Sequence, residues 1–195
     1  MAVPIPNDPF NRIFFAQAFP GWRGYVGATE ETAAFHNGTF LCCSAITLWG
    51  GGANPDLAIE GSLSVMFHAA SGGDFQPADT SLVQTGVVPV GTKSLLFKAQ
   101  GVAPFAVALD GQSLAPVFLS PGPNYTLYGA DISAFAGQEA QLEFRVIAPA
   151  QGYFWVLDSI EFSTQVVPEP GTWALLAVGG VFGWFCWRGK RDRIE

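Results

Sequence analysis

Short apolar runs separated by turn-forming residues make up the sequence between Cys42 and Thr164. The chain contains 23 Gly and 14 Pro, which recur between these runs, and only 9 Lys and Arg residues. This mix favours short strands joined by tight turns over long helices, which favour Ala, Glu, Lys and Leu. Regularly spaced strands with Gly and Pro turns predict an all-β fold, an antiparallel β-sandwich or jelly roll.

Three stretches carry clear signals of strands and turns. Residues 58–70 alternate apolar and polar side chains, as a half-buried strand does. Asp110 and Gly111 stand between two apolar runs and predict a two-residue hairpin, because Gly tolerates a positive φ. Residues 153–163 are predicted to form an alternating final strand.

The chain has a net charge of −7, and its basic residues are unevenly distributed. Four of the nine Lys and Arg residues lie within the last eight positions, so the rest of the chain is more acidic still. A nucleic-acid-binding protein needs a basic surface that neutralises phosphates. The charge distribution therefore excludes nucleic acid as a partner.

The three cysteines indicate neither a disulfide framework nor a metal site. Cys186 lies in the apolar C-terminal run, and Cys42 and Cys43 are neighbours, which rarely bond because the ring would be strained. No CxxC pair and no Cys/His cluster with zinc spacing occurs in the sequence. We predict that Cys42 and Cys43 are two partly buried thiols in a strand.

The C-terminal region contains an uninterrupted apolar run. From Trp173 to Trp187 every residue is apolar or Gly, about 15 residues and about 22 Å as an α-helix. With residues 170–172 included, the run reaches about 18 residues, the lower limit for crossing a bilayer core about 30 Å thick. A helix buried in a soluble core is the alternative, but a β-rich body of this size has little room to enclose one.

The run therefore predicts a membrane helix over about 172–187, followed by a basic tail over 188–193. Trp residues lie toward both ends of this helix, where membrane interfaces favour aromatic rings. The predicted anchor residues are Trp173, Leu175, Leu176, Val178, Val181, Phe182, Trp184, Phe185 and Trp187. The basic tail predicts a cytoplasmic C-terminus, with the body on the far side of the membrane; it consists of Arg188, Lys190, Arg191 and Arg193.

A Pro-Glu-Pro triplet, Pro168, Glu169 and Pro170, directly precedes this helix. The triplet, the apolar span and the basic end resemble a PEP-CTERM protein-sorting segment, with Gly171 where Ser is frequent. The resemblance covers about 30 residues. It implies that an exosortase, a membrane transpeptidase-like enzyme, recognises the triplet, cuts near it, and releases or re-attaches the body outside the cell. Such proteins are typical of Gram-negative bacteria that make exopolysaccharide and biofilm.

The N-terminal residues lack the features of a signal peptide, which needs a basic region followed by about 7–15 apolar residues. Asp8 and several prolines stand where the basic region belongs, and the apolar stretch 13–19 contains Gln17. We expect a start codon assigned too far downstream; a truncated gene and another export route are the alternatives. Residues 6–10 and 27–31 resemble the mature start of many secreted bacterial modules, which fits that expectation.

Four stretches in the second half carry a further resemblance: residues 93–99, 105–114, 124–144 with Asp131, and 153–163 with Asp158. They are similar to parts of extracellular jelly-roll modules of the galactose-binding or carbohydrate-binding type. The resemblance covers about 75 residues and implies a sandwich fold more than a ligand.

The sequence shows no catalytic signature. No G-x-S-x-G elbow accompanies His68, so we interpret this histidine as an ordinary strand residue. A glycosidase needs two carboxylates beside a cleft, but Asp110 and Asp131 are better explained by turns. In related sandwich modules, acids in comparable places bind structural calcium, which makes Asp131 and Asp158 candidate calcium ligands. No other cofactor is predicted.

Aromatic side chains provide a candidate glycan-binding surface. Each presents a flat apolar face with a polar edge nearby, and such a face stacks well on a sugar ring. The candidates are Tyr125, Tyr128, Tyr153 and Trp155. Core packing is the alternative for each, because alternating positions of a sandwich must also fill its interior.

We therefore divide the chain into an N-terminal segment (1–40), a β-sandwich domain (41–164) and a PEP-CTERM sorting segment (165–195). We predict an exported, non-catalytic protein of the cell envelope or exopolysaccharide matrix, held in the inner membrane as a precursor. The expected partners are an exosortase, the membrane and, through weak glycan contact, exopolysaccharide. A secreted enzyme acting on polysaccharide and an unprocessed single-pass membrane protein are the alternatives.

Overall fold

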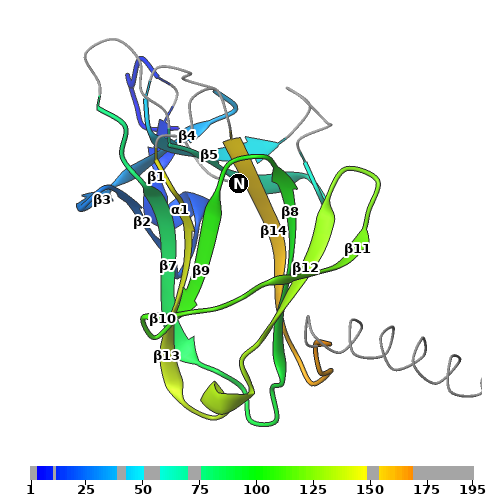
Figure 1. Ribbon diagram of the computed structural model, residues 1–195. Coiled ribbons are helices and arrows are strands. Elements are labelled where there is room, and N and C mark those ends of the chain that lie inside the picture. Colours follow the sequence, from blue (N-terminus) through cyan, green and yellow to red (C-terminus); the bar gives the residue numbers. More distant parts are fainter. Residues whose placement is uncertain are drawn as a thin grey trace, which may run out of the picture.

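The computed structural model describes residues 4–10, 12–38, 43–50, 58–69, 76–148 and 154–168. Within these ranges the chain forms two β-sheets that face each other across one main hydrophobic core (Figure 1). The two-sheet, all-β sandwich predicted from the sequence is confirmed.

The larger sheet has eight strands among the described residues. All of its described neighbours are antiparallel except β4 and β5, which pair in parallel. From edge to edge the order is β1 (Arg12–Phe14), β4 (Ala33–His36), β5 (Ala45–Gly50), β6 (Leu63–His68), β14 (Phe154–Ser163), β8 (Ser94–Gly101), β12 (Thr126–Asp131) and β11 (Val117–Pro121).

The smaller sheet has six described strands, all antiparallel to their neighbours. A single helical turn, α1 (Phe15–Ala18), follows β1, and a 3₁₀ turn (Ser133–Phe135) follows β12. The order of the sheet is β10 (Gln112–Ser113), β9 (Phe105–Leu109), β13 (Glu139–Val146), β7 (Thr80–Val87), β2 (Arg23–Val26) and β3 (Thr29–Glu31).

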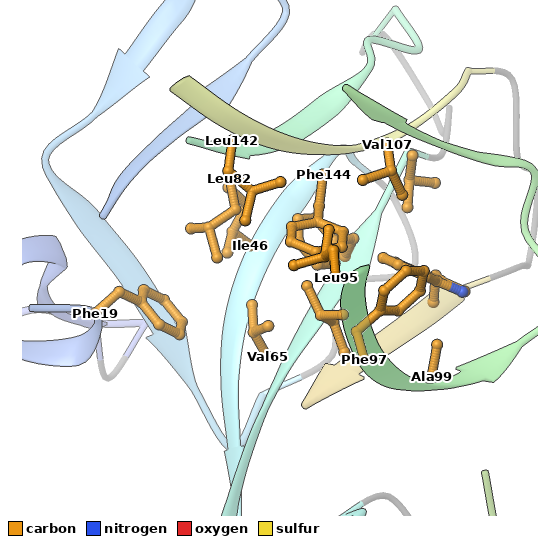
Figure 2. Close-up of a cluster of buried hydrophobic side chains, with 14 of the residues drawn as sticks. Phe19, Ile46, Val65, Leu82, Leu95, Phe97, Ala99, Val107, Leu142 and Phe144 are labelled. Atoms are coloured by element: carbon orange, nitrogen blue, oxygen red, sulfur yellow. The ribbon is translucent and has the colours of Figure 1, made fainter. Parts of the chain in front are cut away.

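Alternation along the strands builds the core between the sheets (Figure 2). On β13 every second side chain from Ala140 to Val146 is buried, while the residues between them are polar. Phe144 of β13 meets Phe97 of β8 from the opposite sheet, edge to face, with 5.2 Å between ring centroids. Each sheet therefore contributes one apolar face, which is the arrangement expected of a sandwich.

The N-terminal residues belong to both sheets. Strands β1 and β4 extend the larger sheet, whereas β2 and β3 form one edge of the smaller one. Ile13 and Ala34 are completely buried in the main core, and a side chain at Gly24 would overlap the ring of Phe15. The domain boundary predicted after residue 40 therefore separates strands that belong to the same two sheets and the same core.

The prediction of a half-buried strand within residues 58–70 is wrong in one respect. Val65 and Phe67 on β6 face the main core as expected, but Ser64, Met66 and His68 are buried as well. A second apolar cluster covers the other face of the strand and excludes water there; it consists of Trp49, Ile59, Met66 and Val156, with Tyr125 and Phe154 packed against it.

Two local predictions from the sequence are confirmed. Asp110 and Gly111 form the turn between β9 and β10, with φ of 50° and 74°, as a two-residue hairpin requires. The final strand, β14, covers most of the predicted range 153–163. Its register shifts between Asp158 and Glu161, where Ser159 has a φ of 49°, so the alternation does not continue along the whole strand.

Several predictions concern residues that the structure does not describe. Cys43 is partly buried ahead of β5, whereas Cys42 lies outside the described residues. Also outside the described residues are Glu169, Pro170, the predicted anchor over about 172–187 and the basic tail. In the described part of the chain, no helix is both long and apolar enough to cross a membrane.

Candidate functional site

The outer face of the smaller sheet carries a row of polar side chains over a shallow floor. Because inward positions on β2, β7 and β13 fill the core, the intervening positions face away from it. They line a hollow of about 420 Å³, to which Arg23, Tyr25, Ser81, Val83, Gln141, Glu143 and Arg145 contribute.

Strand register defines the shape of this face. Tyr25 of β2 pairs with Ser81 of β7, and Ser81 pairs with Arg145 of β13. Arg145 in turn pairs with Ala106 of β9, so large and small side chains alternate across the sheet. A second hollow of about 290 Å³ lies over β9, on the other side of the Glu143 and Arg145 side chains. The two hollows share Glu143 and Arg145, and we call them together the sheet groove.

Arg145 is held in place by two acids at the centre of the sheet groove. Its Nε and Nη2 both donate to Oε1 of Glu143, at 2.9 and 2.8 Å. Its Nη1 lies 3.9 Å from Oδ2 of Asp79, whose other oxygen accepts the backbone N–H of Ala148 at 2.9 Å. The guanidinium is therefore positioned before any ligand arrives, with part of its donor edge still half-exposed.

A second arginine pairs with an acid at the β2 end of the sheet groove. Nη1 of Arg23 lies 3.7 Å from Oε2 of Glu30, and the Tyr25 hydroxyl donates to the same oxygen at 3.3 Å. The guanidinium carbon of Arg23 is 5.7 Å from the centroid of the Tyr25 ring. The positive charge of each arginine in the sheet groove is thus compensated by a neighbouring carboxylate.

This arrangement matches the chemistry of a neutral, hydroxyl-rich ligand. Guanidinium groups donate hydrogen bonds, carboxylates accept them, and a sugar hydroxyl can do both. Tyr25 adds a partly exposed aromatic face, on which the C–H face of a sugar ring can stack. A strongly charged ligand would have to compete with the existing ion pairs.

The structure separates the four aromatic candidates taken from the sequence. Trp155 is 1% exposed and stacks on Phe105 with 4.3 Å between ring centroids, so it fills the core and presents no face to a sugar. Tyr128 also turns toward the core and stacks on Phe97 at 5.4 Å. Tyr125 lies on the face of the larger sheet that points away from the main core, where it packs against the second apolar cluster. Tyr153 is outside the described residues.

Asp158 fastens a loop to the larger sheet. Its Oδ2 accepts hydrogen bonds from the Ser64 hydroxyl at 2.7 Å and from the Glu60 backbone N–H at 3.1 Å. Nζ of Lys98 lies 2.6 Å from Oε2 of Glu60, and the Ser159 hydroxyl donates to that same oxygen. The hydrogen bond from Lys98, followed by the one from Ser159, lowers the pKa of Glu60. These hydrogen bonds therefore join Glu60 to Asp158 and Ser159, which follow it by about a hundred positions in the chain.

Asp131 stands at a turn, as the sequence predicted. Its Oδ1 accepts the Ser133 backbone N–H at 2.8 Å, and this hydrogen bond lowers the pKa of Asp131. Asp131 pairs with Ser94, whereas Asp158 pairs with Lys98, so the two candidate calcium ligands lie at different heights of the sheet. Among the described residues, no three His, Cys, Asp or Glu side chains lie close enough to hold one metal ion.

His68 on β6 is 3% exposed and stacks on Phe154 with 6.1 Å between ring centroids. Its Nε2 is buried and has no hydrogen-bond partner among the described residues. Burial favours the neutral imidazole and lowers the pKa of His68 below its ordinary value of 6.5. The histidine is a strand residue, as the sequence indicated.

We expect acid to destabilise the protein through this histidine. Below pH 6.5 the unfolded chain binds a proton at His68, whereas the folded chain stays neutral until a lower pH. The free energy of unfolding should therefore fall by up to about 1.4 kcal/mol per pH unit below that value. Urea unfolding at about pH 7.5 and 5.5 tests this by comparing the wild type with His68→Asn. An equal loss of stability in both proteins would contradict the assignment.

The described chain ends with the first residue of the Pro-Glu-Pro triplet. Val167 is buried against β12, and Pro168 is exposed beside it. Residues 166–191 match the family model of the PEP-CTERM protein-sorting motif. The C-terminus thus carries this motif, which implies processing by an exosortase and sorting to the cell surface. No curated protein sequence matches the chain.

Several solved structures have a sandwich similar to this one. The carbohydrate-binding module TmCBM61, in complex with beta-1,4-galactotriose, is 14% identical over 75% of this chain and 90% of that one, with a TM-score of 0.47. A variant of a family 29 carbohydrate-binding module is 17% identical over 64% and 83%, with a TM-score of 0.38. The enzymatically active domain of bacteriophage CBA120 tailspike protein 4 is 13% identical over 74% and 19%, with a TM-score of 0.46. At these values the likeness concerns only the general fold.

Sequence reasoning missed the residues of the sheet groove. One signal was present: Gln141, Glu143 and Arg145 alternate with apolar residues, which marks a strand with one polar face. That pattern does not reveal which strands lie beside β13. Tyr25 is 120 positions away from Arg145, and only the pairing of β2 and β13 with β7 brings them to one face.

Proposed function

We propose that this protein is an exported, non-catalytic component of the cell envelope whose body binds neutral glycan in the sheet groove. The observation that carries the glycan part is the combination of Tyr25 with Arg145, Glu143 and Asp79 on one open sheet face. An exopolysaccharide is the ligand of this kind that a surface-sorted protein would meet. The solved carbohydrate-binding modules share the general sandwich fold with this chain, but the proposal rests on the groove residues themselves.

The delivery part of the proposal follows from the C-terminal motif. Residues 1–164 would form the exported body, residues 165–195 the sorting segment, and the helix over about 172–187 the membrane anchor of the precursor. An exosortase would cut near Pro168–Pro170 and leave the body outside the inner membrane. The body alone would then carry the glycan-binding activity.

The glycan part predicts a specific pattern of binding losses. Tyr25→Ala removes the stacking face, and Arg145→Ala removes the central donor; each should weaken glycan binding by about tenfold or more, which corresponds to about 1.4 kcal/mol. Because exposed ion pairs contribute little to folding, Arg145→Ala should leave the fold intact. Affinity electrophoresis of the purified protein in gels containing a panel of neutral and acidic polysaccharides measures these losses.

Tyr125→Ala provides the matched control, since this tyrosine lies on the larger sheet, away from the sheet groove. We expect the control variant to migrate like the wild type in every gel. If glycan binding were lost in Tyr125→Ala and retained in Tyr25→Ala, the glycan site would lie on the larger sheet and not in the sheet groove. Absence of retardation in all the gels would contradict the glycan part of the proposal and leave the sorting part untouched.

A further inference from the structure

The folded body holds the chain up to the start of the sorting motif. After β14 ends at Ser163, the completely buried hydroxyl of Ser94 donates to the carbonyl of Gln165 at 2.8 Å. The Gln165 N–H donates to the Ser163 hydroxyl at 3.1 Å, and the Lys93 N–H donates to the Ser163 carbonyl at 2.8 Å. No free linker therefore separates the sandwich from residue 165.

Val167 is fixed in a position that the body provides for it. It is 7% exposed, whereas its neighbour Val166 is 75% exposed. A Cβ added at Gly129 of β12 would lie 2.8 Å from Cγ2 of Val167 and 2.8 Å from Cδ1 of Leu119. The absence of a side chain at residue 129 thus makes room for Val167, one residue before the Pro-Glu-Pro triplet.

Pro168 lies at the edge of a hollow at this end of the sandwich. In Figure 1 the orange segment that follows β14 lies below β12 in the view. The hollow has a volume of about 380 Å³ and mostly neutral, apolar walls. We call it the motif hollow. It is lined by residues 112–115, by residues 131–135, and by Val167 and Pro168.

We propose that the motif hollow is the surface on which the processing exosortase docks. The inference rests on the sorting part of the proposed function. An enzyme that recognises Pro168–Pro170 has to reach a residue lying against the body, because Val167 is buried there. The predicted membrane helix begins near residue 172, so at most about 14 Å of extended chain separates Pro168 from the membrane. An enzyme at that membrane face meets the walls of the hollow.

The chemistry of the walls agrees with such a partner. Leu114, Ala115 and Ala134 give the motif hollow an apolar lining that is at least partly exposed, and Asp131 is its one described charged residue. Apolar or aromatic side chains of the enzyme would bury this lining and Pro168 together. The folded body would then be part of the signal that the enzyme reads, in addition to the triplet.

The test places an arginine on the wall of the motif hollow in the full-length protein. Ala115→Arg and Ala134→Arg change exposed residues of the hollow, and Val102→Arg is the control at the opposite end of β8, 75% exposed. In cells with an active exosortase, the ratio of precursor to processed protein is followed after a pulse of synthesis. We expect the two hollow variants to be processed at least about tenfold more slowly and the control at the normal rate.

A photo-crosslinking residue at position 134 adds a readout that does not depend on folding effects. It should capture the exosortase, whereas the same residue at position 102 should not. Normal processing of both hollow variants, or no crosslink from position 134, would overturn the docking proposal. If a Pro168/Glu169/Pro170 triple alanine variant were also processed normally, the sorting function itself would be wrong.

Discussion

Replacing Pro168, Glu169 and Pro170 together with alanine is expected to leave the whole protein unprocessed in the inner membrane. The two prolines keep the chain extended and non-helical just before the predicted membrane helix, and alanines would let the helix continue through the triplet. The exosortase would then lose both the side chains it recognises and the extended backbone that presents them. Cell fractionation followed by immunoblotting of precursor and product measures the effect.

A matched control for this variant changes three exposed valines of the body to alanine. Val87, Val90 and Val102 are 64%, 89% and 75% exposed and lie outside the residues that line the motif hollow. We expect normal processing of this control. Normal surface display of the triple Pro168/Glu169/Pro170 variant would show that the motif does not direct sorting in this protein.

Trp155→Ala is expected to destabilise the body severely. The indole lies between the sheets, with its centroid 4.3 Å from Phe105, 5.8 Å from Phe67 and 6.1 Å from Phe97. Removal of a large buried aromatic side chain typically costs about 3–5 kcal/mol, because transfer free energy is lost and a cavity remains. Single domains are usually stable by only about 5–15 kcal/mol, so the variant should unfold at a much lower urea concentration.

The comparison with Tyr125→Ala makes this prediction specific. Tyr125 is partly exposed on the other face of the larger sheet, where Nζ of Lys98 lies 5.0 Å from its ring centroid. Its removal should cost clearly less than removal of Trp155. Urea unfolding followed by far-ultraviolet circular dichroism gives both values. Similar midpoints for the two variants would contradict the placement of Trp155 in the core.

Local sequence signals predicted the parts of the fold that depend on neighbours along the chain. The turn at Asp110 and Gly111 needs only residues that tolerate a positive φ, and the strand ending at Ser163 needs only its own β-forming side chains. The burial of both faces of β6 could not be predicted in the same way. It depends on Ile59 and Val156, which come from a loop and from a strand about ninety residues later.

The candidate functional residues also differ in whether they are neighbours along the chain. The sorting motif was predictable because its triplet, apolar run and basic end are contiguous, and residues 166–191 match the family model. The sheet groove was not predictable, because Tyr25 and Arg145 come together only through their pairing with β7. Trp155, which looked suitable for glycan, faces the main core together with Leu157, whereas Val156 between them packs into the second cluster on the other face of the sheet.

Intact-mass analysis of the native protein from membrane, envelope and medium fractions shows whether the sorting segment is cut and where the product goes. We expect the envelope or medium to contain a product that lacks the apolar run after Pro170 and retains Val167 on the folded body. The inner membrane should contain the longer precursor. A single species that keeps the entire sequence through Glu195 and is confined to the inner membrane would show that the motif is neither cut nor used for sorting in this protein.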